Sequence, residues 1–361
     1  MTDTPENAAR PDLPLAALLR LACAYAVATN GTILMPLIVG ALMRRFGAGE
    51  DAATGFAALE IAGIAVSCAI FPRWIARVPR RLAWIAMIGT LAAQAAGAWM
   101  PTLAAVGGAR LVTGLFEGVL FVVVAASLSN RVAAERAWGV IILVSGVIDC
   151  ALLVAAYAMP PDVVGQWLFV VFAAAFALIA WPSAAAGADA AQPAATTASP
   201  RLRMRWAVLV PIWAVMILVY SVLSAQWALA DVVGHQIGLS PERIGPLLAL
   251  VSLLGTIGAL AASHRRSHEL RLPILWAAQL LVSFAYYAVT PFLTSRISSL
   301  DADGSLLSRS IVITFVAAFI GTALAGTMLT QLGGLGCGLA LGACAVLAMP
   351  FTWKAFGRDA A

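Results

Sequence analysis

Long apolar runs, each broken by at most one charge, fill most of this sequence. Ala52–Phe71 and Val140–Leu153 are typical. A bilayer core of about 30 Å is crossed by roughly 20 apolar residues in a helix, and only helices or closed barrels satisfy their backbone hydrogen bonds there. Barrel strands alternate with a period of two residues, and these runs do not. We therefore predict an all-α polytopic membrane protein.

Composition supports the same class of protein. Of the 361 residues, 62% are hydrophobic and 11% are charged, whereas a soluble domain carries roughly 25% charged residues. The cysteines lie in apolar runs without metal-ligand spacing, so we expect no metal site. The single lysine, Lys354, is not part of the G-x-x-x-x-G-K-[ST] loop of an ATPase. We therefore expect no ATP-hydrolysing site and no cofactor in this chain.

Hydropathy predicts about eleven membrane helices. They cover residues 16–42, 52–71, 82–99, 102–128, 137–158, 164–182, 206–230, 243–262, 272–293, 308–331 and 334–352. Residues 183–205 are small, polar and marked by prolines, which is typical of a flexible linker. The sequence thus predicts an N-terminal six-helix bundle over residues 1–182, a cytoplasmic linker, and a C-terminal bundle of about five helices over residues 206–361.

The two predicted bundles resemble repeats of one another. Phe46–Gly55 precedes the second helix and Ile237–Gly245 precedes the eighth, and each is a short loop with an early glycine and an acidic helix start. Membrane transporters are commonly built from such duplicated bundles. We therefore expect two pseudo-symmetric halves.

Arginines predict the orientation in the membrane. With the N-terminus inside, most arginines of the first nine helices fall in inner segments, whereas only Arg44, Arg45 and Arg243 fall in outer loops. Basic loops stay on the cytoplasmic side. The net charge of +5 is therefore expected to set orientation rather than to bind nucleic acid. We predict a multi-pass protein of the plasma membrane, the bacterial inner membrane, with a cytoplasmic N-terminus.

Two local patterns and this layout resemble the major facilitator superfamily. The loop Pro72–Arg81 resembles the family's basic loop G-x-L-A-D-R-x-G-R-[RK], with arginines on its basic positions and Ala76 in place of the aspartate. In the fourth helix, Arg110–Gly118 is similar to the family pattern R-x-x-x-G-x-x-x-G. The resemblance implies a secondary transporter, a cavity lined by helices 1, 4, 7 and 10, and a cytoplasmic gating loop containing Arg73, Arg77, Arg80 and Arg81.

The second half departs from the twelve helices that the resemblance implies. Residues 272–293 begin after a basic loop as a ninth helix would, but lead into a segment that resembles the loop after a tenth. They are too few to cross the bilayer twice, so about one helix is expected to be missing. An odd number of helices would place Arg296, Arg309, Lys354 and Arg358 outside, against the charge bias.

Four ionisable residues near the middle of predicted spans are candidates for proton coupling or substrate binding: Arg110, Glu117, Glu60 and Asp149. Ionisable groups in a membrane are costly and functional by default. The spacing of Arg110 and Glu117 puts both on one helix face with Gly114 and Gly118, which let a neighbouring helix or a substrate approach. We expect this face to line the central cavity. The alternative is that the charges pair within a bundle and only fix its packing.

Polar and aromatic residues on the first, fourth and seventh helices are expected to line the same cavity: Tyr25, Asn30, Gly114, Tyr220, Gln226 and Trp227. The alternative for each is helix packing or anchoring at the membrane interface.

These observations predict a monomeric secondary active transporter of small organic solutes that works by alternating access, either by proton-coupled efflux, which we favour, or by uptake through symport. Its partners would be the solute, the proton and the lipid bilayer. The alternative is a non-transporting or degenerate family-like sensor or scaffold, favoured by the missing helix and the altered basic loop. An enzyme is not expected, because no nucleophile–base pattern appears in a span.

Overall fold

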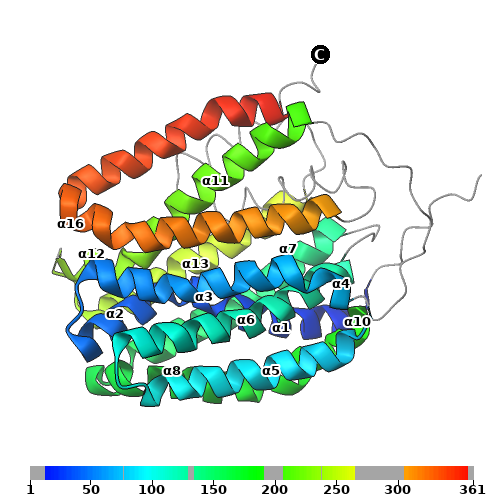
Figure 1. Ribbon diagram of the computed structural model, residues 1–361, viewed down its shortest axis with the longest axis horizontal. Coiled ribbons are helices and arrows are strands. Elements are labelled where there is room, and N and C mark those ends of the chain that lie inside the picture. Colours follow the sequence, from blue (N-terminus) through cyan, green and yellow to red (C-terminus); the bar gives the residue numbers. More distant parts are fainter. Residues whose placement is uncertain are drawn as a thin grey trace, which may run out of the picture.

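Helices running side by side make up the described part of the chain (Figure 1). The computed structural model describes residues 13–75, 77–128, 134–190, 206–236, 238–264 and 305–356. These residues contain no strand, and 7 of their helices are long and apolar enough to cross a membrane. The predicted all-α multi-pass membrane fold is confirmed. The predicted helix at residues 272–293 and Arg296 lie outside the described residues.

The N-terminal half runs to Ala190. It consists of α1 (Leu15–Ile33), α2 (Met35–Phe46), α3 (Glu50–Ile70), α4 (Pro72–Ile75), α5 (Pro79–Ala96), η1 (Gly97–Trp99), α6 (Leu103–Leu128), α7 (Ala134–Tyr157), α8 (Pro161–Leu178), α9 (Ala180–Ala185) and α10 (Gly187–Ala190). The first eight residues of the predicted linker, 183–190, are helical in α9 and α10, and Ser183 and Ala184 are buried. Residues 191–205 lie outside the described part.

The C-terminal half begins at Trp206. It consists of α11 (Trp206–Ala228), α12 (Ala230–Gln236), α13 (Pro241–His264) and α16 (Ser305–Phe356). The chain of α16 turns back at Gly333, whose φ of 67° is a left-handed conformation that glycine adopts without strain. Figure 1 shows the two arms of α16 on either side of this turn, so this element crosses the bundle twice.

The two halves share their local geometry at the sites of the predicted repeat. The first long helix of each half is interrupted near its end, at Leu34 between α1 and α2 and at Leu229 between α11 and α12. Each loop that follows contains a glycine with positive φ, Gly47 at 61° and Gly238 at 82°. Acidic residues then lie in the first turns of α3 and α13, where the positive end of the helix dipole stabilises their negative charge.

Basic residues gather at one end of the bundle. We call the end where α1 and α11 begin the inner end, following the charge bias of the sequence, and the opposite end the outer end. The start of α16 packs beside α11 at the inner end, where Trp213 Nε1 donates to Ser310 Oγ (2.9 Å). Its second arm also finishes there (Figure 1). Arg309 and Lys354 therefore lie at the inner end, in agreement with the charge bias and not with an odd number of crossings.

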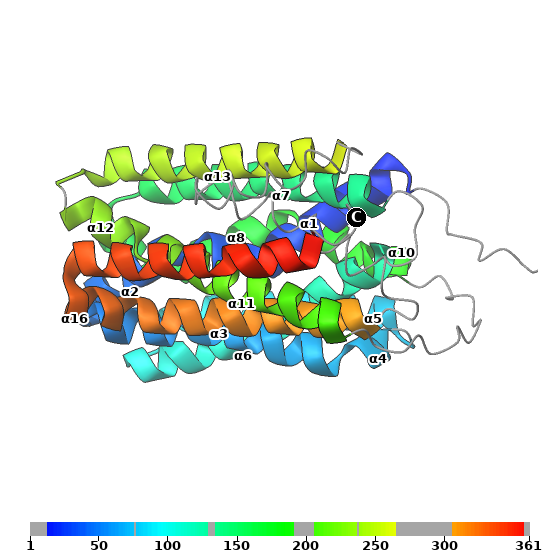
Figure 2. The same ribbon diagram turned by 90° about the horizontal axis from the view of Figure 1, so that it is seen from above.

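The halves meet along two helix pairs. On one side α3 packs against α16, where the Gly326 N–H donates to Thr54 Oγ1 (3.2 Å). On the other side α7 packs against α13, where Cys150 Sγ donates to the Ala249 carbonyl (3.3 Å). Figure 2 shows α7 and α13 side by side along their length. These two contacts enclose the space between the halves.

Exposed tryptophans mark both ends of the bundle. Trp84 and Trp181 stack edge to face near the inner end, and Trp99 and Trp167 do so near the outer end. Between these levels the outer faces expose aliphatic side chains such as Ile88 and Leu324. Tryptophan rings favour the two membrane interfaces and aliphatic faces favour the lipid core. This pattern supports a bilayer around the middle of the bundle.

Candidate functional site

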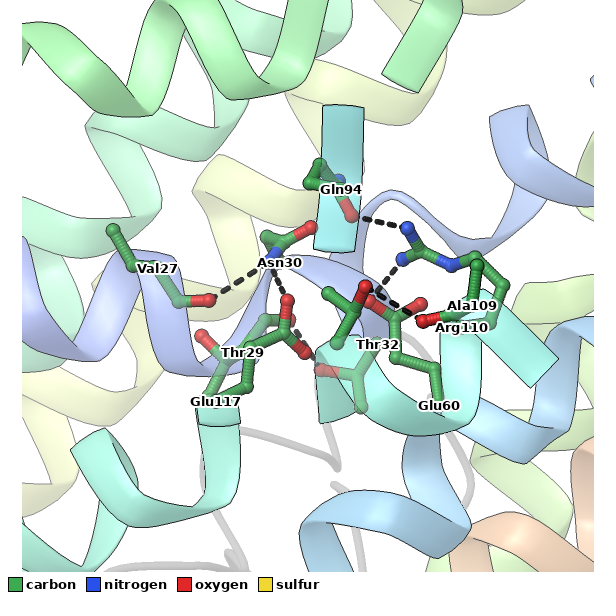
Figure 3. A network of polar contacts seen from close by, with 10 residues as sticks. Val27, Thr29, Asn30, Thr32, Glu60, Gln94, Ala109, Arg110 and Glu117 are labelled. Carbon is green, nitrogen blue, oxygen red and sulfur yellow. Dashed lines mark hydrogen bonds and ion pairs between the residues drawn. The ribbon is translucent and has the colours of Figure 1, made fainter. Parts of the chain in front are cut away.

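A buried polar cluster lies inside the N-terminal half. We use this name for Asn30 of α1, Glu60 of α3, Gln94 of α5, and Arg110 and Glu117 of α6 (Figure 3). All five residues are between 0% and 1% exposed. Because an uncompensated charge in such surroundings is very costly, the contacts among them decide whether this half can fold.

Arg110 is compensated from three helices. Its guanidinium forms an ion pair with Glu60 and donates a hydrogen bond to Oε1 of Gln94. The guanidinium carbon also lies 4.9 Å from the centre of the Phe169 ring in α8, within range of a cation–π contact. Arg110 thus ties α3, α5 and α8 to α6. Its carboxylate partner is Glu60, whereas Glu117 lies seven residues along the same helix, about 10 Å away along its axis.

Glu117 is held by α1. Its Oε1 accepts a hydrogen bond from Asn30 Nδ2 (2.5 Å), and the same amide group donates to the Val27 carbonyl (2.8 Å). The carboxyl groups of Glu117 and Glu60 interact with one another. Glu60 also lies against Gly31, where an added Cβ would overlap its carboxylate. Two carboxyl groups and one guanidinium therefore share one enclosed site.

Glycines bring α3 and α6 together at this level. A Cβ on Gly114 would overlap the backbone carbonyl of Glu60, and a Cβ on Gly63 would overlap that of Leu111. Such close approach of backbones is the usual reason for small residues between membrane helices. Gly114 therefore faces α3, and its side is closed by helix packing.

A cavity of about 380 Å³ lies between the two halves, towards the outer end. Its volume is within the usual range of small-molecule sites. Most of the lining is apolar. The lining residues are Thr32, Ile33, Met35, Ile61, Leu223, Ser224, Gln226, Trp227, Ala230, Val233, Gly234, Leu239, Leu247, Leu248, Val251, Ser252 and Thr322.

Consecutive residues of α1 join the cluster to the cavity. Asn30 and Gly31 contact the carboxyl groups, whereas Thr32 and Ile33 line the cavity. Ile33 is the last residue of α1, and its carbonyl accepts a hydrogen bond from the Trp227 indole (2.8 Å). Carbonyls in the last turn of a helix lack an intrahelical donor. The interruption of the helix thus creates a contact between the halves.

The sequence-predicted lining residues divide into two groups. Gln226 and Trp227 line the cavity. Asn30 belongs to the polar cluster, Gly114 to the helix contact, Tyr220 is buried in α11, and Tyr25 stacks with other aromatic rings. Arg110 and Glu117 also lie inside the N-terminal half and not in the lining of the cavity, contrary to the expectation for this helix face. Arg110 and Glu117 of α6 adjoin the cavity through their partners on two helices: Asn30 lies two residues before the lining residue Thr32 in α1, and Glu60 directly precedes the lining residue Ile61 in α3.

Some residues of the site have no distinctive sequence pattern. Gln94 and Phe169 complete the surroundings of Arg110, and Ser252 and Thr322 line the cavity. A lone glutamine, phenylalanine or hydroxyl in an apolar run is most often a packing residue. The sequence offered a signal only for Gln94, a polar side chain inside a predicted span.

Asp149 is the fourth predicted ionisable residue, and it lies apart from the cluster. It is 0% exposed in α7, and neither carboxyl oxygen has a hydrogen-bond partner among the described residues. The neighbouring Cys150 contacts α13. Asp149 is therefore buried in α7, the helix that packs against α13, and no described contact joins it to the cluster.

An outer latch joins the halves at the outer end. Asp231 of α12, 2% exposed, accepts a hydrogen bond from the Tyr157 hydroxyl (2.8 Å) and lies 3.9 Å from the Arg44 guanidinium. Its carboxylate packs against Gly40, where an added Cβ would overlap it. Tyr157, Arg44 and Gly40 all belong to the N-terminal half, so Asp231 fixes α12 across the cavity.

An inner aromatic contact joins the halves nearer the inner end. The Phe121 ring of α6 lies 5.0 Å from that of Phe315 of α16, edge to face. Tyr25 and Trp138 stack within the N-terminal half, 5.6 Å apart, and both rings lie near Phe121. The cavity is therefore bounded by a charged contact on one side and an apolar contact on the other.

The predicted gating loop lies at the inner end. Arg77, Arg80 and Arg81 are exposed, and Arg73 is in α4, with its side chain outside the described residues. Gly187 of α10 packs against the backbone of Arg80. In the described ranges, no group of His, Cys, Asp and Glu side chains is arranged to hold a metal ion.

The helical arrangement is that of known transporters. The human organic anion transporter MFSD10 (TETRAN) is similar with a TM-score of 0.67 at 16% identity, covering 93% of this chain and 98% of that one. The xylose transporter XylE from E. coli, in a partially occluded inward open conformation, gives 0.67 at 12% identity, with 94% and 97% covered.

A bacterial homologue of the human lysosomal transporter Spinster, inward-facing and unoccupied, gives a TM-score of 0.58 at 12% identity, with 94% of this chain and 95% of that one covered. No protein-family model and no curated protein matches the sequence. The similarity is therefore one of fold, and it confirms the fold of the major facilitator superfamily over nearly the whole chain.

Proposed function

We propose that this chain, which has the major facilitator fold, is a secondary active transporter that couples the movement of small organic solutes to protons. The observation that carries the proposal is the pair of carboxyl groups, Glu60 and Glu117, buried with one guanidinium next to a cavity between the halves. A helix-packing role needs only one carboxylate for Arg110. The second carboxyl group requires another explanation.

The charge balance of the cluster explains the second carboxyl group. With both carboxyl groups ionised, Glu60, Glu117 and Arg110 carry a net charge of about −1, and one bound proton makes the site neutral. A buried site is far more stable when neutral, whereas contact with water lowers the cost of charge. The cluster is thus suited to take up one proton when enclosed and to release it when opened.

Solute and proton are linked through α1 in this proposal. A solute that moves Thr32 or Ile33 in the cavity also moves Asn30 and Gly31 against the two carboxyl groups, because all four belong to the last turn of one helix. The interruption at Leu34, followed by Pro36 in the first turn of α2, gives this turn freedom to move.

Alternating access would use the two contacts that bound the cavity. Opening outward would break the outer latch at Asp231, and opening inward would separate Phe121 from Phe315. Both contacts are small beside the two helix pairs along which the halves meet. The halves could thus rock about those pairs.

We further propose export as the direction, from a monomer in the plasma membrane with the inner end cytoplasmic. The positions of Arg309 and Lys354 support this orientation. The mostly apolar lining of the cavity supports export, because apolar solutes partition into a bilayer and cross it unaided. Because such solutes enter the cell without a carrier, a proton-coupled carrier for them is useful for export and not for uptake.

Reconstitution in liposomes tests the proposal. A panel of small organic solutes is screened for solute-dependent proton movement with a pH-sensitive dye trapped in the lumen. We expect at least one solute to move protons with the wild-type chain and none to do so with Glu117→Gln. If correctly folded wild-type protein moves protons with no solute, the transporter proposal is wrong and a sensor or scaffold remains.

A further inference from the structure

The lining of the cavity carries information about the cargo beyond the proposed function, on which the following inference rests. Among the described residues that line it, no side chain is charged. Two carboxylates of the described residues are adjacent in sequence to lining residues, Glu60 next to Ile61 and Asp231 next to Ala230. Glu60 is paired with Arg110, and Asp231 is held by Tyr157 and Arg44.

A charged cargo would therefore lose its water without gaining a partner. The penalty for burying an unpaired ion is far larger than that for a neutral polar group with a hydrogen bond. The described lining thus disfavours anions and cations alike. Its volume of about 380 Å³ is near the lower end of small-molecule sites, so the cargo is also small.

Two hydroxyl groups of the lining are buried. Ser252 of α13 is 3% exposed and Thr322 of α16 is 0% exposed, and neither side-chain oxygen has a partner among the described residues. The thiol of Cys150, a weak hydrogen-bonding group, lies beside Ser252. Buried polar groups are nearly always satisfied in native proteins. Both residues line the cavity, so a bound molecule could satisfy them.

The remaining wall is suited to an apolar body. Trp227 exposes its ring to the cavity while its indole N–H is already bonded to the Ile33 carbonyl. Leu223, Leu247 and Val251 add aliphatic surface. Aromatic and aliphatic walls with a few placed polar groups are typical of sites for uncharged organic molecules.

We propose that the cargo is a small, uncharged, mainly apolar organic molecule whose hydrogen-bonding group binds Ser252 and Thr322 and whose apolar body packs on Trp227. Both hydroxyls come from the C-terminal half, whereas Thr32 and Ile33 approach from the N-terminal half. Such a molecule would bridge the halves without touching the buried charges.

Binding of matched naphthalenes to the purified full chain in detergent tests this assignment by calorimetry. The probes are 1-naphthol, naphthalene and 1-naphthalenesulfonate, which share a ring and differ in one group. We expect 1-naphthol to bind at least tenfold more tightly than the sulfonate. We also expect Ser252→Ala and Thr322→Val each to weaken 1-naphthol about fivefold, the usual value of one hydrogen bond, and to leave naphthalene unchanged.

Thr90→Val is the matched control, because Thr90 is another buried hydroxyl without a described partner and does not line the cavity. It should leave binding of all three probes unchanged. Tighter binding of the sulfonate, no effect of either cavity variant on 1-naphthol, or no binding of any probe to folded protein would overturn the assignment. Binding needs no transport, so a failure of the proposed function would appear separately, as normal binding without proton movement.

Discussion

The buried polar cluster and the cavity are adjacent regions of the same membrane protein with opposite chemistry. The cluster holds two carboxyl groups and a guanidinium, closely paired and enclosed within one half. The cavity lies between the halves and presents apolar surface and two hydroxyls without a hydrogen-bond partner among the described oxygen and nitrogen atoms. The difference separates two tasks: the charges that could bind a proton never meet the cargo directly. The last turn of α1 and the adjacent residues Glu60 and Ile61 of α3 touch both.

The comparison predicts that changes in the cluster mainly affect folding and coupling, whereas changes in the cavity mainly affect binding. The largest effect is expected for Arg110→Gln. It leaves Glu60 buried without its cation, which typically costs about 3–5 kcal/mol. Thermal unfolding in detergent and the folded yield should both fall clearly.

Two further variants test whether that loss of stability comes from the unpaired carboxylate. In the double variant Glu60→Gln with Arg110→Gln, Glu117 is the one ionisable group left in the cluster, and one bound proton makes the site neutral, so most of the stability should return. Arg309→Gln, at an exposed position, is the control for removing an arginine. A double variant as unstable as Arg110→Gln would show that the ion pair is not what the cluster depends on.

A smaller loss is expected where α3 and α6 approach. Gly114→Ala places a methyl group on the Glu60 carbonyl, and the helices must separate, at a cost of about 1–3 kcal/mol. Gly108→Ala on the same helix meets open space and is the matched control. Thermal unfolding measures both. Equal stability of the two variants would mean that Gly114 does not set the distance between these helices.

Weakening the outer latch should have an intermediate effect on how often the outer end opens and little effect on folding. Asp231→Asn keeps an acceptor for Tyr157 but removes the charge facing Arg44, so opening at the outer end should become more frequent by about tenfold, for a loss of roughly 1.5 kcal/mol. A cysteine at Ser224, which lines the cavity, reports this by labelling from outside. The native cysteines are first replaced.

Phe121→Ala is the matching change on the inner side, because it removes the aromatic contact with Phe315. It should slow labelling of the same cysteine from outside, whereas Asp231→Asn should speed it. Labelling that changes in the same direction in both variants would contradict two opposed contacts around one cavity.

The smallest effect is expected for Trp227→Phe. The change keeps an aromatic wall but removes the indole N–H that bonds the Ile33 carbonyl, a hydrogen bond worth about 1 kcal/mol. Thermal stability should fall slightly, and coupling should weaken because α1 is less firmly attached to α11. Unchanged proton movement per solute would show that this contact does not link the halves.

The sequence predicted the helical fold and the importance of intramembrane charges, but not the ion-pair and hydrogen-bond partners of those charged residues. Apolar runs and loop arginines depend on local composition, so they are readable along the chain. The partner of Arg110 lies 50 positions away on another helix, and helix spacing alone favoured a shared cavity with Glu117. Glycine spacing was readable, but whether Gly114 faces a helix or a substrate depends on how α3 packs. Ser252 and Thr322 resemble ordinary packing hydroxyls until the cavity is seen.

Glu117→Gln measures the separation of charge and cargo most directly. The glutamine still offers an oxygen to Asn30 and should preserve the fold, and it cannot release a proton. Binding of 1-naphthol in detergent and its accumulation in proteoliposomes under an imposed pH gradient are measured on the same preparation. We predict that binding stays within about twofold of the wild type, a difference of roughly 0.4 kcal/mol, while pH-driven accumulation is lost. Loss of binding, or accumulation that still follows the pH gradient, would contradict the separation of the two tasks.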